Sequence, residues 1–276
     1  HYLANTVAEE AIASSQREGA ATTRKVAKAM LEQGRKPSNN DEQMIFNNYL
    51  LMRKAYACRQ QPLDIQLIRQ FHHVATLNTK HPDLIPGEFR KKDDVHVVDI
   101  RTDESLHVPP KATDIEQRLQ TLCDFANNNH DGRDGRVFID PVVKAIILHF
   151  MIGYEHPFTD GNGRTARALF YWFMFKNGHT DFQYISISAL LKKAPAQYVD
   201  SYLYTETDEG DLTYFIDYQL KIITRAIDSL LDYLKRKQQD LYDIMSWLQD
   251  SVFITQKILN TKEIIILRKA IRHPGR

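Results

Sequence analysis

Residues 156–167 of this 276-residue chain read HPFTDGNGRTAR, and no other stretch of the sequence is as informative. His156 can accept a proton near neutral pH, because the ordinary pKa of imidazole is about 6.5. Asp160 offers a carboxylate of the kind through which Mg²⁺ often binds beside substrate phosphates. The stretch predicts a site that binds a nucleotide polyphosphate and activates a hydroxyl group.

The segment Gly161-Asn162-Gly163 predicts a phosphate-binding turn between two helices. Glycine lets the backbone approach a ligand closely, and backbone N–H groups at a helix N-terminus form an anion site. Arg164 and Arg167 are three residues apart, so they share one face of the next helical turn. Cations are disfavoured at a helix N-terminus. Two arginines at this position are therefore explained if phosphates bind there. Taken singly, each feature also fits a solvated turn.

The rest of the chain is dominated by apolar residues spaced three and four apart, which indicates helices. The helix expected from Pro141 is strongly apolar, follows the N-cap residue Asp140 and is predicted to lie at the centre of the fold. Residues 86–110 lack this spacing and contain β-leaning pieces at 95–98 and 106–108, which predict a β-hairpin. We therefore expect an all-α fold, a helical bundle with a small β-hairpin.

The sequence also suggests a division into three parts. We expect an N-terminal segment over residues 1–40, a core domain over 41–235 and C-terminal helices over 236–276. Within the first part, Thr6 and Glu9 have the spacing of a capping box that would begin a helix.

The amino-acid composition indicates which kinds of binding partner and which cellular compartment to expect. The formal net charge is +1, from 36 basic and 35 acidic side chains, which favours neither nucleic acid nor an anionic membrane. No apolar run reaches the roughly 18 residues of a membrane span, and the first residues lack a signal-peptide pattern. Cys58 and Cys123 match no metal or disulfide spacing, so we expect reduced thiols and a cytoplasmic protein. The missing initiator Met indicates a fragment or a processed form.

Residues 156–167 match, position for position, the Fic family signature His-Pro-Phe-x-Asp/Glu-Gly-Asn-Gly-Arg-x-x-Arg. The hairpin entry at Gly87 and Arg90 and the Pro109-Pro110 exit also resemble this family, and the similarity extends over residues 1–235. The resemblance implies the Fic fold with its β-hairpin flap. It also implies an enzyme that uses Mg²⁺ and transfers AMP from ATP to a hydroxyl side chain of a target protein.

Carried over to this sequence, the resemblance gives each signature residue a role. His156 would be the general base, and Asp160 would hold Mg²⁺ between the α- and β-phosphates. Segment 161–163 would cradle the phosphates, while Arg164 and Arg167 would bind the β- and γ-phosphates. The Ala-Asn-Lys variant of the kinase-like Doc branch is absent, which favours nucleotide transfer over phosphate transfer.

Residues 14–19, SSQREG, resemble the inhibitory motif of this family, Ser/Thr-x-x-x-Glu-Gly/Asn. The resemblance implies that Glu18 pairs with Arg167 and blocks placement of the γ-phosphate, while Ser14 steadies the helix and its glutamate. A carboxylate competes with a phosphate for the same guanidinium donors, so low basal activity is expected. Without the signature, a solvated helix end with a glycine cap would fit these residues as well.

Three further features each have two interpretations. Tyr198 and Tyr202 are four residues apart on one expected helix face, where they either contact adenine or belong to the core. The hairpin near residues 95–108 either docks a Ser, Thr or Tyr of a target by β-augmentation or is purely structural. The segment from Asn260 either begins a truncated winged-helix domain, the only setting for nucleic-acid binding, or is an ordinary terminal helix.

The signature does not read the nucleotide base, so alternatives to AMP transfer share the same residues. One alternative is another donor, such as UTP or GTP, or the removal of AMP from a target. A second is a non-enzymatic regulator that senses nucleotide through this pocket. The chain itself is a further candidate target, through self-modification.

Overall fold

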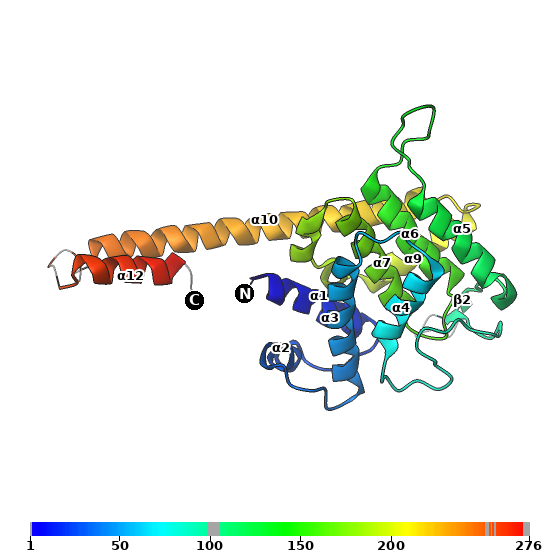
Figure 1. The fold of residues 1–276 in the computed structure, drawn as a ribbon, viewed down its shortest axis with the longest axis horizontal. Coiled ribbons are helices and arrows are strands. Elements are labelled where there is room, and N and C mark those ends of the chain that lie inside the picture. The colour runs from blue at the N-terminus through cyan, green and yellow to red at the C-terminus, as the bar shows by residue number, and fades with distance from the viewer. Residues whose placement is uncertain (1, 99–104, 252–253, 255, 257, 273–276) are drawn as a thin grey trace. The chain divides into compact units, whose positions relative to one another are not determined.

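The computed structural model describes residues 2–98, 105–251, 254, 256 and 258–272. Contacts divide the chain into two units, residues 1–224 and 225–276. The first unit is almost entirely helical, as predicted, and carries one small β-hairpin (Figure 1). Its first helices are α1 (Tyr2–Arg17), α2 (Arg24–Gln33), α3 (Asn40–Ala57), α4 (Ile65–Thr76) and α5 (Ile115–Asn127). They are followed by α6 (Pro141–Glu155), α7 (Asn162–Lys176), α8 (Ile187–Leu191) and α9 (Pro195–Thr207), with 3₁₀ turns at Ala112–Asp114 and Thr180–Tyr184.

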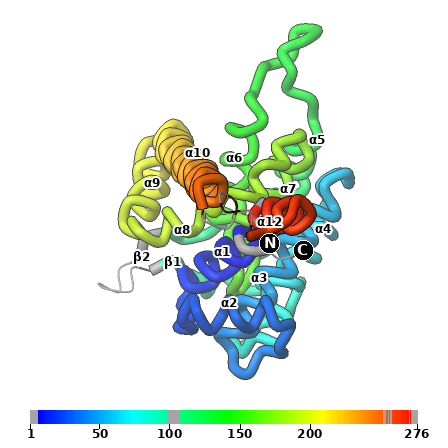
Figure 2. Tube along the Cα trace, turned by 90° about the vertical axis from the view of Figure 1, so that its left-hand side faces the viewer, coloured from blue at the N-terminus to red at the C-terminus, as the bar shows by residue number. Residues whose placement is uncertain are grey.

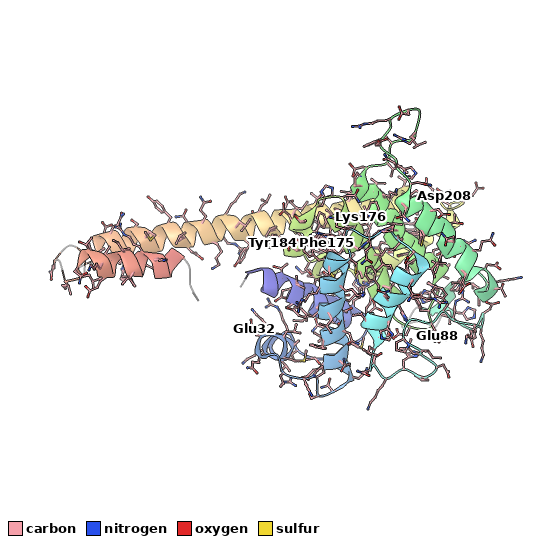
Figure 3. All side chains as sticks on the ribbon, in the orientation of Figure 1. Glu32, Glu88, Phe175, Lys176, Tyr184 and Asp208 are labelled. Carbon is pink, nitrogen blue, oxygen red and sulfur yellow. The ribbon has the colours of Figure 1, made fainter. Side chains whose placement is uncertain are left out.

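Helices α6 and α7 form the centre of this unit, and in Figure 2 α9 and α4 lie on opposite sides of them. Helix α6 begins as predicted, because the Asp140 side chain accepts a hydrogen bond from the Val142 N–H at 2.8 Å and Pro141 occupies the first turn. Helix α7 is buried along nearly its whole length. Near its end Phe175 is still buried, whereas the last residue, Lys176, is partly exposed. Both residues are labelled in Figure 3.

Helix α1 is built into the core of the first unit. Its Ile12 packs with Ala27 of α2 and Ile45 of α3. The predicted capping box at Thr6 is wrong, since α1 already begins at Tyr2 and Thr6 lies buried inside it. Threonine is tolerated inside a helix, so the spacing of Thr6 and Glu9 does not by itself fix where the helix begins.

The β-hairpin consists of β1 (Val97–Val98) and β2 (Ser105–His107), which pair antiparallel. Residues 99–104, which also belong to the segment predicted to dock a target, lie outside the described residues. Arg90 holds both ends of the hairpin, because its Nη1 donates to the Lys92 carbonyl at 2.9 Å and its Nη2 donates to the Pro110 carbonyl.

Helix α10 (Thr213–Asp250) begins in the first unit and continues into the second. The second unit also contains α12 (Thr261–Arg272). Both helices expose large apolar side chains, Trp247 and Ile266 among them. Among the described residues, no helix has the length and apolarity needed to cross a membrane. The division at residues 40 and 235, and a winged-helix continuation, remain predictions.

Candidate active site

The loop between α6 and α7 carries the signature and is anchored from within. Phe158 is fully buried, and its ring stacks on the imidazole of His72 with centroids 3.6 Å apart. The Asn162 side chain closes the loop, since it accepts from the Phe158 N–H at 2.9 Å and donates to the Phe158 carbonyl at 2.8 Å. Asn162 therefore shapes the loop with its side chain, while its backbone forms the first residue of α7.

Gly161 makes the turn into α7 feasible. Its φ of +85° lies in the left-handed region, where a side chain is strained. A Cβ on Gly161 would also come within 2.7 Å of the Thr76 methyl group on α4. Glycine is thus required here by the close approach of α4, while the predicted approach of this backbone to a ligand stays a prediction.

His156 ends α6 in the left-handed conformation, with φ 42°. Its Nδ1 lies 3.2 Å from the Gly153 carbonyl, which can only accept, so Nδ1 carries the proton and Nε2 is the free basic nitrogen. Arg90 fixes the backbone here by donating from Nε to the His156 carbonyl at 2.9 Å. Burial lowers the pKa of His156 to about 4, so the ring is neutral at pH 7.

His72 on α4 supports the same loop. Its Nδ1 accepts from the Gly87 N–H at 2.9 Å, so its Nε2 must carry the proton and donate to the Asp160 carbonyl at 2.8 Å. Burial lowers the pKa of His72 to about 4, which keeps this neutral tautomer in place. His72 thereby joins the signature loop to the entry of the β-hairpin.

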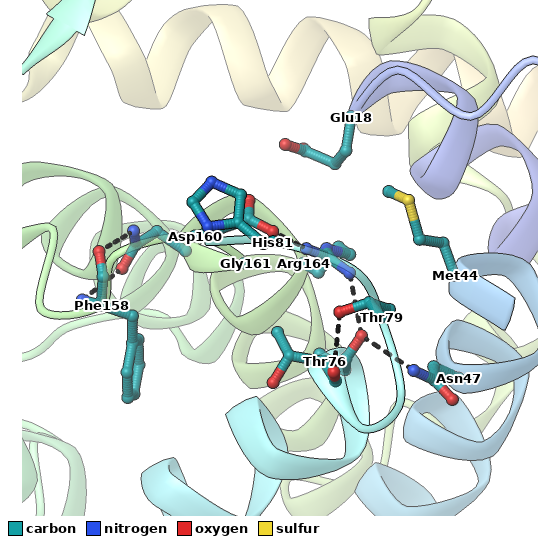
Figure 4. A network of polar contacts seen from close by, with 12 residues as sticks. Glu18, Met44, Asn47, Thr76, Thr79, His81, Phe158, Asp160, Gly161 and Arg164 are labelled. Atoms are coloured by element: carbon teal, nitrogen blue, oxygen red, sulfur yellow. Dashed lines mark hydrogen bonds and ion pairs between the residues drawn. The ribbon is translucent and has the colours of Figure 1, made fainter. Parts of the chain in front are cut away.

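Asp160 and Arg164 hold each other at the start of α7. The Arg164 Nη2 lies 2.7 Å from the Asp160 Oδ2, and its Nη1 donates to the Ala75 carbonyl at the end of α4 (Figure 4). Arg164 is only 1% exposed, whereas the Asp160 side chain is 33% exposed. The aspartate therefore offers an accessible carboxylate, while the arginine is engaged inside the protein.

The donor set around Asp160 fits Mg²⁺ held mainly by substrate. Among the described residues, no group of three or more His, Cys, Asp or Glu side chains could hold a metal ion. Mg²⁺ typically takes one or two protein carboxylates and completes its shell with phosphate oxygens and water. A single exposed carboxylate beside the turn at residues 161–163, where phosphates are predicted to bind, meets that requirement.

Glu18 and Arg167, the predicted pair, do meet in the structure. Arg167 Nη2 lies 2.6 Å from Glu18 Oε1, and Arg167 Nε donates to the Ser14 hydroxyl at 2.8 Å. Ser14, which was predicted to steady the helix and its glutamate, contacts the arginine of the pair with its hydroxyl. Gly163 leaves the space for this contact, since a Cβ there would lie 2.5 Å from the same carboxylate oxygen.

The charges of this pair are strongly coupled. Burial works to raise the pKa of Glu18, but the Arg167 and Arg164 guanidiniums outweigh it and hold the pKa below its ordinary value. Arg167 is only 2% exposed, and burial works against its charge, but Glu18 raises the pKa of Arg167 in return. Both groups are charged at neutral pH.

A cavity of about 220 Å³ brings most of the predicted site together. Its wall includes His156, Asn162, Gly163, Arg167, Glu18, Tyr198 and Tyr202. Asp160 and Arg164 lie beside this wall and are not part of it. The Tyr198 hydroxyl lies 2.9 Å from Nε2 of the buried His149 and 3.4 Å from the Tyr202 hydroxyl. The tyrosine pair is thus both packed in the core and present at the cavity.

His107 connects the β-hairpin to the same cavity. Its Nδ1 lies 2.9 Å from the Glu206 carboxylate and its Nε2 lies 2.6 Å from the Tyr154 carbonyl. Both partners can only accept, so both ring nitrogens carry protons and the imidazole is a cation. Burial works to lower the pKa of His107, but the bonds to Glu206 and Tyr154 raise it above its ordinary value.

Sequence reasoning missed the roles of His72, His107 and Arg90. The signal for Arg90 was available in the Gly87-x-x-Arg90 spacing, although the sequence does not show that its side chain reaches His156. The two histidines act through residues far away in the sequence, and no local pattern identifies them.

Comparisons with known proteins relate this chain to one family. Residues 62–174 match the profile of the Fic/DOC family. The chain is 28% identical over 191 residues to the protein adenylyltransferase Fic of Nematostella vectensis, a match covering 69% of this chain and 38% of that protein. It is 38% identical over 64 residues to protein adenylyltransferase fic-1 of Caenorhabditis elegans, covering 23% of this chain and 12% of that protein. The chain thus spans well under half the length of these curated relatives.

Solved structures share the fold. A Fic-domain-containing signaling protein from Bacteroides thetaiotaomicron aligns with a TM-score of 0.69 and 20% identity over 85% of this chain and 88% of that one. Fic-1 from C. elegans aligns with a TM-score of 0.63 and 22% identity, over 84% of this chain and 64% of that one.

Proposed function

Because the chain carries a domain of the Fic/DOC family, we propose that it transfers AMP from ATP to a hydroxyl side chain of a target protein, under restraint by Glu18. One observation carries the proposal. A neutral histidine with a free Nε2 and a buried arginine held by a carboxylate face one cavity at the start of α7.

His156 would act as the general base. The target hydroxyl oxygen attacks the α-phosphorus of ATP, the bond from that phosphorus to the bridging oxygen breaks, and pyrophosphate leaves. The hydroxyl proton passes to Nε2 of His156, whose ring is oriented by the Nδ1 bond to the Gly153 carbonyl. Arg90 keeps the histidine in place through its bond to the His156 carbonyl.

The phosphates would bind where α7 begins. The backbone N–H groups of Asn162 and Gly163 and the guanidinium of Arg167 provide donors for them. Asp160 would hold Mg²⁺ with these phosphates, and bound Mg²⁺ supplies neutralisation of their negative charge. For Arg164 to bind phosphate as well, it would exchange its contact with Asp160 for one with the nucleotide.

Glu18 would restrain the reaction by occupying Arg167. The carboxylate takes the guanidinium donors that a γ-phosphate needs, and it remains ionised at neutral pH because the arginines lower its pKa. The Ser14 hydroxyl accepts a hydrogen bond from Nε of the same guanidinium. Removal of Glu18 would leave Arg167 free for a phosphate.

Tyr198 and Tyr202, which line the same cavity as Arg167, would form the base end of the site. The hairpin, joined to the cavity by His107, would present the target segment or a segment of the chain itself. We place the activity in the cytoplasm because Cys58 and Cys123 are free thiols in this fold.

Labelled nucleotides test this function. The Glu18→Gly protein is incubated with Mg²⁺ and with ATP labelled on the α- or the γ-phosphorus, then separated by electrophoresis. We expect label from the α-position only, and far less of it with wild type. Label from the γ-position would indicate phosphate transfer, and label only from UTP or GTP would indicate another donor. Binding of ATP without any label would favour the nucleotide-sensing regulator.

A further inference from the structure

Arg17, the last residue of α1, lies on the ring of Tyr198 inside the cavity. Its guanidinium carbon is 4.0 Å from the ring centroid, a stacking distance for a cation on an aromatic face. Its Nη1 lies 3.4 Å from the Leu191 carbonyl. The next residue in the chain is Glu18, so two consecutive side chains enter the same cavity in different directions.

The remaining surroundings of Tyr198 are occupied by protein. The rings of His149, Tyr202 and Phe215 lie around it, with centroids between 5.2 and 6.0 Å away, and the residue is only 9% exposed. The face under Arg17 is consequently the one on which a planar group from the cavity can stack. A guanidinium is itself planar, and it takes that place here.

The size of the cavity supports the same conclusion. Its volume of about 220 Å³ is below the roughly 300–1,000 Å³ that is usual for small-molecule sites. A nucleotide therefore gains room only if side chains that now line the cavity move. Arg17 and Glu18 are the lining residues that come from the end of α1.

We propose that Arg17 occupies the position at which the nucleobase would stack on Tyr198. A nucleotide that binds in the cavity must then displace the Arg17 side chain. This inference rests on the proposed function, because that function directs the base of the nucleotide toward Tyr198. Glu18 then stands in for a phosphate on Arg167 while Arg17 stands in for the base on Tyr198. The two contacts are separate, so each can be tested by itself.

Nucleosides separate the two contacts, because they carry a base but no phosphate. We would measure dissociation constants for adenosine, guanosine and uridine, and for ATP with Mg²⁺, by titration calorimetry. The proteins are wild type, Arg17→Ala, Arg17→Gln and Glu18→Gln. The Arg17 variants should bind at least one nucleoside about three- to thirtyfold more tightly than wild type, as expected when a cation–π contact no longer competes. Glu18→Gln should bind that nucleoside within about twofold of wild type and should bind ATP more tightly.

Arg59 provides a matched control. Its guanidinium carbon also lies 4.0 Å from a tyrosine ring centroid, that of Tyr56, but neither residue lines the cavity. Arg59→Ala should leave the affinities for nucleosides and for ATP unchanged.

The outcomes separate this inference from the function on which it rests. Circular dichroism would first show that both Arg17 variants are folded. If they then bind every nucleoside no better than wild type, Arg17 does not occupy the base position. That conclusion holds even when Glu18→Gln binds ATP. The same conclusion follows if Arg59→Ala changes nucleoside affinity as much as the Arg17 variants do. If no protein, Glu18→Gln included, binds any nucleotide, the proposed function itself fails.

Discussion

The N-terminal helix and the residue that follows it make two ion pairs of the same length that differ in their surroundings. Glu9 binds Arg24 and Glu18 binds Arg167, each with an N···O distance of 2.6 Å. The two carboxylates are similarly exposed, at 27% and 25%. The arginines are not, because Arg24 is 68% exposed and Arg167 only 2%.

This difference decides what each pair can do. When Arg24 loses its partner, water replaces the carboxylate, so the pair contributes at most about 1 kcal/mol. Arg167 has little access to water, so its charge requires an anionic partner from the protein or from a ligand. The burial of the arginine, more than the hydrogen bond itself, makes the Glu18 pair suitable as a switch operated by a phosphate.

The largest expected effect concerns the chemistry that the switch would control. In a Glu18→Gly background, His156→Ala should lower the rate of AMP incorporation by about 10²- to 10⁴-fold, the usual contribution of a general base. Retained ATP binding, measured by calorimetry, would show that the loss is one of chemistry. Activity within about threefold of the parent would remove His156 from the mechanism.

The arginines should differ next in their contributions to stability. Arg167→Ala should lower the free energy of unfolding by about 2–4 kcal/mol, because it removes a buried charged group that bonds both Glu18 and Ser14. Arg24→Ala should cost at most about 1 kcal/mol. Urea unfolding followed by circular dichroism measures both, and equal costs for the two variants would contradict the role given to burial.

The pH dependence of AMP incorporation should distinguish the general base, His156, from the restraining residue, Glu18. Since the pKa of His156 is lowered to about 4, its neutral, basic form persists as the pH falls from 8 to about 5. The rate of the Glu18→Gly protein should be flat over that range and fall about tenfold per pH unit below 4. An inflection near 6.5 would indicate an exposed, unperturbed histidine.

Wild type should remain restrained across the same range. The pKa of Glu18 is held below its ordinary value, so the carboxylate stays charged down to acidic pH and the contact with Arg167 persists. The stabilisation from this carboxylate is present above its unfolded pKa and is lost as the pH falls through its lower folded pKa. A rise in wild-type activity between pH 7 and pH 5 would be incompatible with this order of pKa values.

The smallest effect should come from the exposed pair. Glu9→Gln should change the free energy of unfolding by less than about 1 kcal/mol and leave AMP incorporation unaltered. Urea unfolding and the labelling assay measure the two quantities. A larger change would show that α1 transmits effects along its length, and the two pairs could no longer be treated separately.

Local sequence predicted much of this site because its key residues are close together in the chain. The signature placed His156, Asp160 and Arg167 on one loop and helix, and the motif at residues 14–19 identified the partner of Arg167. The start of α6 was also predictable, since Asp140 and Pro141 act within one turn.

The remaining features depend on packing between distant segments. Arg164 bonds the Ala75 carbonyl and Arg17 lies on Tyr198, contacts that no spacing in the sequence encodes. Thr6 failed as a helix start for a different reason, because threonine is tolerated inside a helix and its spacing from Glu9 does not stop α1 from beginning at Tyr2.

The most direct test of the central claim compares AMP incorporation from α-labelled ATP by wild type, Glu18→Gln and Glu9→Gln under identical conditions. If the buried arginine makes the Glu18 pair a restraint, Glu18→Gln should incorporate about 10- to 100-fold more label, as expected from losing a charge-assisted hydrogen bond. Glu9→Gln should match wild type. Equal incorporation by all three proteins would contradict the account, because the pair with the buried arginine would then restrain the reaction no more than the exposed one.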